Sequence, residues 1–216
     1  MLKQMLCTLA LVFPVAVFAA PQAATKPAAK VTTPTKADTD KTPAPAENPK
    51  VLIHTSMGDM TIELYPDKAP NTVENFLRYV NEGFYDGTVF HRVIDNFMIQ
   101  GGGWTKNLTR KRPHAPIRNE ANNGLSNLRG TVAMARTGDP NSAAAEFFIN
   151  VVDDKRLDYV GGANGPVSWG YCVFGKVISG MDTVDKIKAV KTGPQGPFQS
   201  DVPETPVVIE KVSVVK

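Results

Sequence analysis

The sequence has few of the side chains on which metal, redox and nucleophilic sites are usually built. Its 216 residues include 2 cysteines and 3 histidines. Cys7 lies in an apolar leader, so removal of that leader leaves Cys172 as the single thiol and excludes an intramolecular disulfide. No two of His54, His91 and His114 stand at ligand spacing, so we expect no metal site and no cofactor.

Motifs for phosphate binding and covalent catalysis are also missing. The glycines at 101–103 are followed by Trp-Thr-Lys, which has Lys and Thr in the wrong order for a phosphate-binding loop and no helix signal behind it. No recognisable nucleophile elbow or adjacent base surrounds the candidate nucleophiles Ser126, Ser142, Ser168 and Cys172. A catalytic triad assembled only in the fold stays open at this point.

The part of the chain expected to fold, residues 51–216, has a formal net charge of zero. The chain has 24 Lys and Arg and 21 Asp and Glu, of which 6 and 3 fall in the first 50 residues. The remaining 166 residues therefore carry 18 of each sign, which excludes a broad basic surface for nucleic acid. A local basic cluster remains between Lys106 and Arg118. We interpret it as a solvated loop, with an anion site as the alternative.

The first 50 residues differ from the rest in composition. Residues 1–19 combine a lysine at position 3, a short apolar run and small residues at the end, which predicts a cleaved signal peptide. An uncleaved membrane anchor is the alternative. Residues 20–50 contain six prolines and no aromatic residue, which predicts a disordered linker. We therefore expect a periplasmic or secreted protein, detached from the membrane after cleavage, with a folded domain at 51–216.

Short β-favouring runs dominate this domain, and two amphipathic segments interrupt them. Apolar side chains recur at helical spacing in 70–83 and 181–190. Strands are expected at 51–55, 60–65, 88–94, 97–100, 130–135, 146–151, 171–179 and 205–215. A Gly- and Asn-rich irregular stretch is expected from 101 to about 129. About eight strands without regular strand-helix alternation predict a mostly β fold, an antiparallel barrel or sandwich with helices.

The stretch 90–103, FHRVIDNFMIQGGG, combines apolar and cationic side chains in a predicted hairpin. Strand alternation places Phe90 and Arg92 on one face of the first strand, and Met98 and Gln100 on one face of the second. An arginine among apolar groups is costly to bury unless it is paired, and Gln100 can accept from its guanidinium. The alternative is an arginine that reaches from the sheet into solvent.

This stretch closely resembles the signature of the cyclophilins, the cyclosporin-binding family of peptidyl-prolyl isomerases. The resemblance continues through GTVAMAR at 130–136, EFFIN at 146–150 and YCVFGKV at 171–177, in the family's order over nearly all of 51–216. It implies a closed eight-stranded antiparallel β-barrel capped by two α-helices, which agrees with the elements expected above. It also implies rotation of X-Pro bonds in proline-containing polypeptides, a reaction that needs no nucleophile, metal or cofactor.

The resemblance implies roles for individual positions. Arg92 matches the catalytic arginine, and Gln100 matches the residue that orients it. The positions that match the apolar proline pocket are Phe97, Met98, Phe148 and Leu157. The other substrate-binding positions are Ala135 and Arg136, through their backbone, with Glu146 and Tyr171. Without the resemblance, ordinary barrel core would be the preferred interpretation of Phe97, Met98 and Phe148.

Three positions depart from the pattern common in the family. Arg156 replaces a tryptophan, which removes an aromatic contact and an N–H donor, so we expect weak cyclosporin binding with catalysis largely retained. Tyr171 replaces a histidine and keeps an aromatic body with a polar tip, so we expect it to be tolerated. Glu146 replaces a glutamine and is expected to place a carboxylate near Arg92.

Two classes of function follow from these residues. The first is a monomeric, exported prolyl isomerase that acts on newly translocated or unfolded chains. The second is a non-catalytic proline-binding chaperone module that uses the same groove. The presence of Arg92 together with its expected pocket favours the enzyme.

Overall fold

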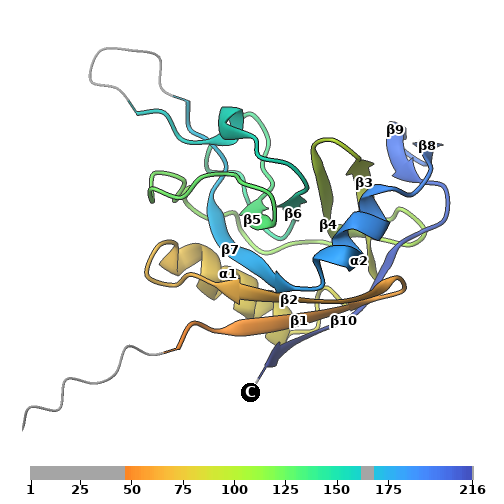
Figure 1. Cartoon of the computed structure of the whole chain (residues 1–216), viewed down its shortest axis with the longest axis horizontal. Helices are drawn as coiled ribbons and strands as arrows, with labels where there is room; N and C mark the ends of the chain where they lie inside the picture. The colour runs from red at the N-terminus through yellow and green to blue at the C-terminus, as the bar shows by residue number, and fades with distance from the viewer. Residues whose placement is uncertain (1–46, 162–167, 216) are drawn as a thin grey trace, which may run out of the picture. The chain divides into compact units, whose positions relative to one another are not determined.

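The chain forms a barrel of antiparallel strands with two helices and one additional hairpin (Figure 1). The barrel strands are β1 (Lys50–Thr55), β2 (Gly58–Leu64), β3 (Thr88–Ile94), β4 (Met98–Thr105), β5 (Thr131–Met134), β6 (Phe147–Asn150), β7 (Val173–Ser179) and β10 (Val208–Val215). The other elements are α1 (Pro70–Asn81), a 3-10 turn η1 (Lys155–Leu157), α2 (Met181–Lys188), β8 (Thr192–Gln195) and β9 (Phe198–Pro203). This computed structural model describes residues 47–161 and 168–215, and within them eight strands close in the order β1-β10-β3-β4-β6-β5-β7-β2. The expected eight-stranded barrel with two helices is confirmed.

The first barrel strand lies near the beginning of the described residues. The strand β1 begins at Lys50, one residue before the expected domain start. The predicted signal peptide at 1–19 and nearly all of the predicted linker at 20–50 lie outside the described residues. Within the described part of the chain, the longest helix has 12 residues, and no helix is long and apolar enough to cross a membrane.

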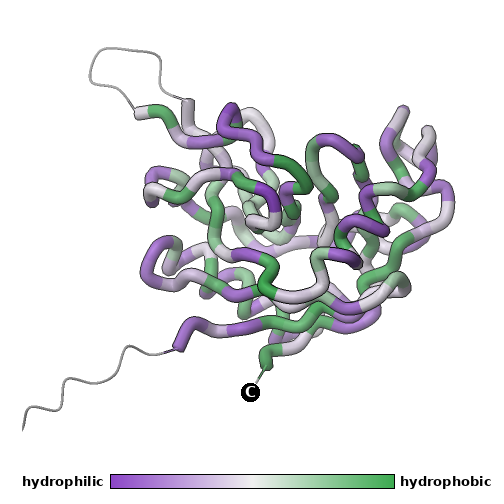
Figure 2. The backbone as a smooth tube through the Cα atoms, viewed as in Figure 1, coloured by the Kyte–Doolittle hydropathy of each residue, from purple (hydrophilic) through white to green (hydrophobic). Residues whose placement is uncertain are grey.

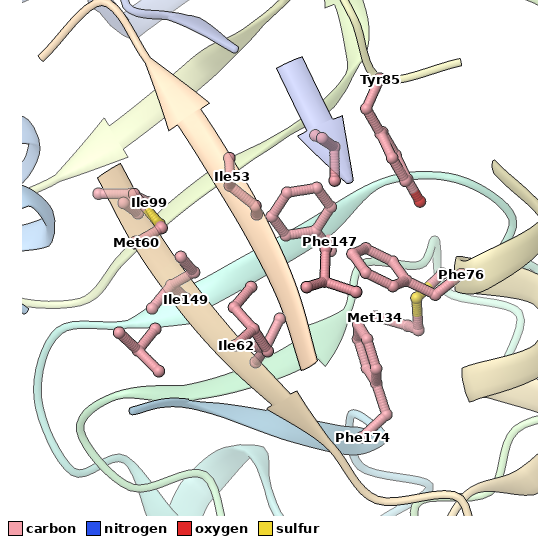
Figure 3. Packing of buried hydrophobic residues seen from close by; sticks show 14 of the residues in the cluster. Ile53, Met60, Ile62, Phe76, Tyr85, Ile99, Met134, Phe147, Ile149 and Phe174 are labelled. Carbon is pink, nitrogen blue, oxygen red and sulfur yellow. The ribbon is translucent and has the colours of Figure 1, made fainter. Parts of the chain in front are cut away.

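Apolar side chains fill the barrel and attach the first helix to it (Figure 3). Hydrophobic residues follow the barrel strands, while hydrophilic residues concentrate in the connecting turns (Figure 2). Phe147 on β6 contacts Phe76 edge-on, with ring centroids 5.6 Å apart, and Tyr85 in the same manner at 5.5 Å. The Phe76 ring also lies 5.1 Å from Phe174 on β7. Because all four rings are fully buried, α1 is part of the core rather than an attachment to the surface.

Helix α1 forms where the sequence predicts it, and a distant side chain completes its first turn. Pro70 stands at the beginning, where its missing N–H is not needed. The carboxylate of Glu120 accepts from the backbone N–H of Asn71 at 3.2 Å and of Thr72 at 2.9 Å. A carboxylate at this end also complements the helix dipole. Glu120 therefore fixes the irregular segment after β4 against the helix.

Strand β4 is longer than expected. The sequence suggested that regular structure ends at Gln100, but β4 continues through the three glycines to Thr105. Gly102 has φ of 85°, and a Cβ there would lie 2.9 Å from the rings of both Phe147 and Tyr85. Gly102 is thus required for close packing against the aromatic core, and the expectation of an irregular segment starting at residue 101 was wrong.

An irregularity in β3 changes which side chains share a face. Phe90 pairs with Gly101, and Arg92 pairs with Gln100, the neighbour of Gly101 in β4. The strand β3 therefore contains one extra residue, His91, between these two pairs. Such a bulge shifts the side-chain alternation by one position. Phe90 therefore packs in the main core, whereas Arg92 faces away from it. The expectation that Phe90 and Arg92 share a face was wrong for this reason.

Gly180, which joins β7 to α2, provides a test of the packing. Its φ is 85°, and a Cβ would lie 2.2 Å from the backbone oxygen of Asp59. We expect Gly180→Ala to lower the free energy of unfolding by about 2 kcal/mol, because it adds left-handed strain and a backbone clash. The matched control is Gly138→Ala, whose added methyl group meets nothing within 4 Å. Equal urea midpoints for the two variants would contradict this packing.

Candidate active site

Nine of the ten predicted site residues come together around one cavity outside the main core of the barrel. Its volume is about 90 Å³. Nine residues line it, all of them predicted from the sequence: Arg92, Phe97, Met98, Gln100, Ala135, Arg136, Phe148, Leu157 and Tyr171. They come from β3, the turn before β4, β4, β6, η1 and the segments that follow β5 and precede β7.

The floor of this cavity is an apolar cluster separate from the main core. Met98 and Phe148 are buried there with Ala133 and Val173, and Phe97 packs against them half-buried. Strand pairing positions them, because β6 lies between β4 and β5 and places Phe148 opposite Gln100 and Ala133. The alternative interpretation placed these side chains in the main barrel core. The structure instead places them in a separate cluster. They form a small hydrophobic surface that faces the cavity.

Arg92 lies at the rim, with its side chain 43% exposed. It stands opposite Gln100 in the sheet, but the Gln100 amide donates to the Glu146 carboxylate at 2.9 Å. Within the described residues, Arg92 makes no side-chain hydrogen bond to Gln100, and no nitrogen of its guanidinium lies within 4.0 Å of a Glu146 carboxylate oxygen. The carboxylate closest to it is that of Asp201, with Oδ2 3.9 Å from Nε. The expectation that Glu146 places its charge next to Arg92 was therefore wrong.

One wall of the cavity is aromatic and cationic. The rings of Phe148 and Tyr171 meet edge-on with centroids 5.6 Å apart. The Arg136 guanidinium lies over Tyr171 at 4.4 Å and donates to the Gly170 carbonyl at 2.9 Å. Leu157 is tied to this wall, because its carbonyl accepts from the Tyr171 N–H at 2.8 Å. The Tyr171 ring is thus packed between Phe148 and Arg136 and forms part of this wall.

The backbone along this wall is partly available to a substrate chain. The Ala135 N–H donates to the Glu146 carbonyl at 2.9 Å. Within residues 47–161 and 168–215, the backbone N–H of Arg136 has no hydrogen-bond partner. An unpaired donor beside an apolar cavity can pair with an extended peptide.

Glu146 lines a neighbouring cavity rather than the first one. That cavity has a volume of about 230 Å³ and shares Gln100, Ala135 and Arg136 with the first. The Glu146 carboxylate lies 3.4 Å from His91 Nε2 and 3.8 Å from Arg110 Nε. Of the ten predicted site residues, Glu146 is therefore the one that contacts the first cavity only indirectly, through Gln100.

His91 is buried directly behind the rim. Burial, together with the positive charges of Arg92 and Arg110, lowers the pKa of His91 to about 4. The imidazole is therefore neutral at neutral pH, and its contact with Glu146 is that of a neutral ring with a carboxylate. It follows that His91 adds no charge beside Arg92.

A known protein family matches most of the chain. The family described as cyclophilin-type peptidyl-prolyl cis-trans isomerase/CLD matches residues 50–214. The chain belongs to this family. Peptidyl-prolyl cis-trans isomerase B of Escherichia coli K12 is 57% identical over 164 residues, covering 76% of this chain and 98% of that protein. A peptidyl-prolyl cis-trans isomerase of Streptomyces antibioticus is 55% identical over 165 residues, covering 76% and 98%.

The cyclophilin fold is also found among solved structures. A Cryptosporidium parvum cyclophilin-type isomerase, solved in the presence of the dipeptide ala-pro, matches with a TM-score of 0.64 at 26% identity. The match covers 77% of this chain and 99% of that chain. Like its relatives, this cyclophilin is a peptidyl-prolyl cis-trans isomerase.

The hairpin of β8 and β9, which the sequence did not predict, lies beside the cyclophilin site. Phe198 on β9 packs on His91, with ring centroids 5.4 Å apart, and edge-on against Trp104 at 4.9 Å. It brings Asp201 to Arg92. The turn residues in TGPQGPF were a usable signal, but the flanking strands lack the apolar alternation that would identify them.

The structure also describes the other groups singled out in the sequence of this cyclophilin: possible metal ligands, the Cys172 thiol and the basic cluster between Lys106 and Arg118. Within the described residues, no three His, Cys, Asp or Glu side chains gather as metal ligands. Burial raises the pKa of the Cys172 thiol to about 11, so the thiol stays protonated. In the basic cluster, Lys111 donates to the Phe84 carbonyl and His114 lies 2.7 Å from the Glu82 carboxylate. Arg110 and Lys111 of this cluster also line the neighbouring cavity, so the interpretation of the cluster as a solvated loop stays a prediction.

Proposed function

We propose that Arg92 accelerates rotation about X-Pro bonds by stabilising the twisted amide. The observation that carries this proposal is the shared cavity, which places the Arg92 side chain at the rim of an apolar pocket formed by Phe97, Met98, Phe148 and Leu157. A proline ring fits the chemistry of that floor. The bond before the proline then lies within reach of the guanidinium.

The physical barrier explains why one fixed cation is sufficient. Rotation about a peptide bond is opposed by about 18–20 kcal/mol of amide resonance. In the twisted state the proline nitrogen becomes pyramidal and regains a localised lone pair. A donor aimed at that nitrogen binds the twisted state better than either planar isomer, and this difference in binding lowers the barrier. No bond is made or broken, so no nucleophile or cofactor takes part.

The other site residues hold the substrate in place. Met98 and Phe148 provide a dry floor, on which each hydrogen bond to Arg92 is stronger than in water. The N–H of Arg136 pairs with the peptide backbone on one side of the rotating bond, while the apolar floor holds the proline ring on the other. Gln100, held by Glu146, forms the boundary between the two cavities.

We further propose that the protein is exported and acts as a monomer on newly translocated or unfolded chains. The support is the sequence of residues 1–19, which has the pattern of a signal peptide, and the proline-rich composition of 20–50. An isomerase for such clients assists protein folding, because X-Pro isomerisation takes tens to hundreds of seconds without a catalyst.

The test of the proposed function is a protease-coupled assay of a short Xaa-Pro peptide. The purified wild type is expected to accelerate cis to trans conversion, and Arg92→Ala is expected to lose most of this activity. Wild-type binding of proline peptides without acceleration would instead support the non-catalytic module. That alternative is not favoured, since the relatives are named isomerases.

Cyclosporin is expected to bind weakly, and Arg156 is the proposed cause. The Arg156 side chain is 88% exposed and is held by the buried Asp154 carboxylate through two nitrogens, each at 2.8 Å. Arg156→Trp is expected to tighten cyclosporin binding about tenfold, because an indole adds aromatic contact and a donor. Lys155→Trp, at the exposed neighbouring position, is the matched control. Fluorescence titration showing equal affinity for Arg156→Trp and wild type would contradict this explanation.

A further inference from the structure

We propose that Asp201 is a positioning residue for Arg92, held next to it by the hairpin of β8 and β9. This inference rests on the proposed role of Arg92. Asp201 Oδ2 lies 3.9 Å from Arg92 Nε, and within the described residues no other carboxylate lies within 4.0 Å of this guanidinium. Both side chains are partly exposed, at 34% for Asp201 and 43% for Arg92. The pair is therefore solvated enough to move, yet close enough to bias the direction of the guanidinium.

The hairpin is fixed against the strand that carries Arg92. Phe198 packs on His91, the residue before Arg92, and on Trp104 of β4. Val202, the residue after Asp201, is 3% exposed. Apolar contacts on both sides of Asp201 thus fix the distance between β9 and β3.

The backbone at Asp201 holds its carboxylate in a defined direction. Its φ is 66°, a left-handed conformation that Asp and Asn adopt more readily than other non-glycine residues. The Ser200 hydroxyl donates to Asp201 Oδ2 at 2.9 Å. The oxygen that faces Arg92 is therefore the one fixed by the neighbouring hydroxyl.

The contact leaves the working end of the arginine available. Asp201 approaches Nε, so the two terminal nitrogens are further from the carboxylate and can point toward the cavity. A restraint at Nε limits the rotation of the guanidinium about its stem, and less orientational freedom is then lost in the twisted state. The expected effect of Asp201 is on kcat, with KM unchanged, because the apolar floor still binds the proline ring.

The test compares variants that remove the charge with a control from the same hairpin. Asn tolerates left-handed backbone and Gly adopts it freely, so Asp201→Asn and Asp201→Gly are both expected to fold. Each is expected to lower kcat about two- to fivefold, the range of an exposed ion pair, with KM unchanged. The matched control is Glu204→Gln, which removes a carboxylate that pairs with Lys191 at 2.9 Å. It is expected to leave both constants at wild-type values.

Two further readouts separate positioning from a structural effect. Salt at about 0.5 M should lower wild-type kcat toward that of Asp201→Asn and leave the variant unchanged, because it screens an exposed pair. In an Arg92→Ala background, Asp201→Asn should have no additional effect. An unchanged or increased kcat in Asp201→Asn overturns the inference, and so does a loss equal to that of Glu204→Gln. If Arg92→Ala keeps wild-type activity, the proposed role of Arg92 fails instead.

Discussion

Replacing Arg92 by alanine is expected to lower kcat/KM for a short Xaa-Pro peptide by about 10²–10³-fold, the usual cost of removing a preorganised electrostatic contact to a transition state. In the proposed mechanism the Arg92 guanidinium, carried by the strand β3, acts on the rotating bond, while the pocket floor retains the proline ring. The loss should therefore appear in kcat more than in KM. The protease-coupled assay measures both against the uncatalysed rate.

Two variants show whether the effect belongs to the guanidinium. Arg92→Lys keeps the positive charge without the planar fork, so an intermediate activity is expected. Arg129→Ala removes an equally exposed arginine that pairs with Asp185 at 2.7 Å, away from the cavity, and should leave activity unchanged. If Arg92→Ala retains more than about a tenth of wild-type kcat/KM, electrostatic stabilisation by this residue is excluded as the main source of catalysis.

Acidification from pH 7 to pH 4 is expected to lower the free energy of unfolding by about 3 kcal/mol through His91 alone. The pKa of this imidazole is about 4 in the folded protein and 6.5 in its ordinary state. Below pH 6.5 the unfolded chain binds a proton that the folded protein does not bind. The contribution of the neutral His91 to the free energy of unfolding is therefore complete above pH 6.5, and it decreases as the pH falls toward 4. Urea unfolding at closely spaced pH values measures this decrease.

Other titrating groups act in different pH ranges. Hydrogen bonding to Asp59 raises the pKa of the exposed His54, so its contribution is complete below pH 6.5 and is lost as the pH rises through the raised pKa. The contact with Arg156 lowers the pKa of Asp154, whose contribution is lost only below its ordinary value of 3.8. His91→Gln should therefore remove most of the decrease between pH 6.5 and 4, while His54→Gln should not. An unchanged acid slope in His91→Gln would contradict the burial of a neutral imidazole.

The barrel and most of the site could be predicted because their signals are local. The apolar positions of 70–83 repeat at helical spacing, and the strand at 88–94 is rich in β-branched and aromatic residues. The long resemblance around Arg92 then identified the nine residues that meet at the first cavity. Local pattern and family motif pointed to the same elements, which is typical of a sequence with little internal conflict.

The remaining features depend on tertiary contacts that have no local signal. The bulge after Phe90 reverses the alternation of side chains in β3. The register of β3 against β4 and the packing of the Phe90 ring against Phe147 reveal this reversal. Glu146 contacts Gln100 and His91 because of how β4 and β6 pair. The hairpin with Asp201 is fixed by Phe198 against residues more than 90 positions earlier in the chain. Each of these features changes the electrostatic surroundings of Arg92. The sequence therefore predicted Glu146 as the carboxylate near Arg92, whereas the structure places Asp201 there.

The most direct test of the central claim is NMR exchange spectroscopy of a labelled proline peptide at saturating protein. This measurement separates binding from interconversion, since chemical-shift titration gives the Kd and the exchange peaks give the rate between bound cis and trans forms. If Arg92 stabilises the twisted amide, Arg92→Ala should bind with a Kd near that of wild type while its exchange rate falls about 10²-fold or more. An exchange rate equal to that of wild type, at equal Kd, would contradict the claim.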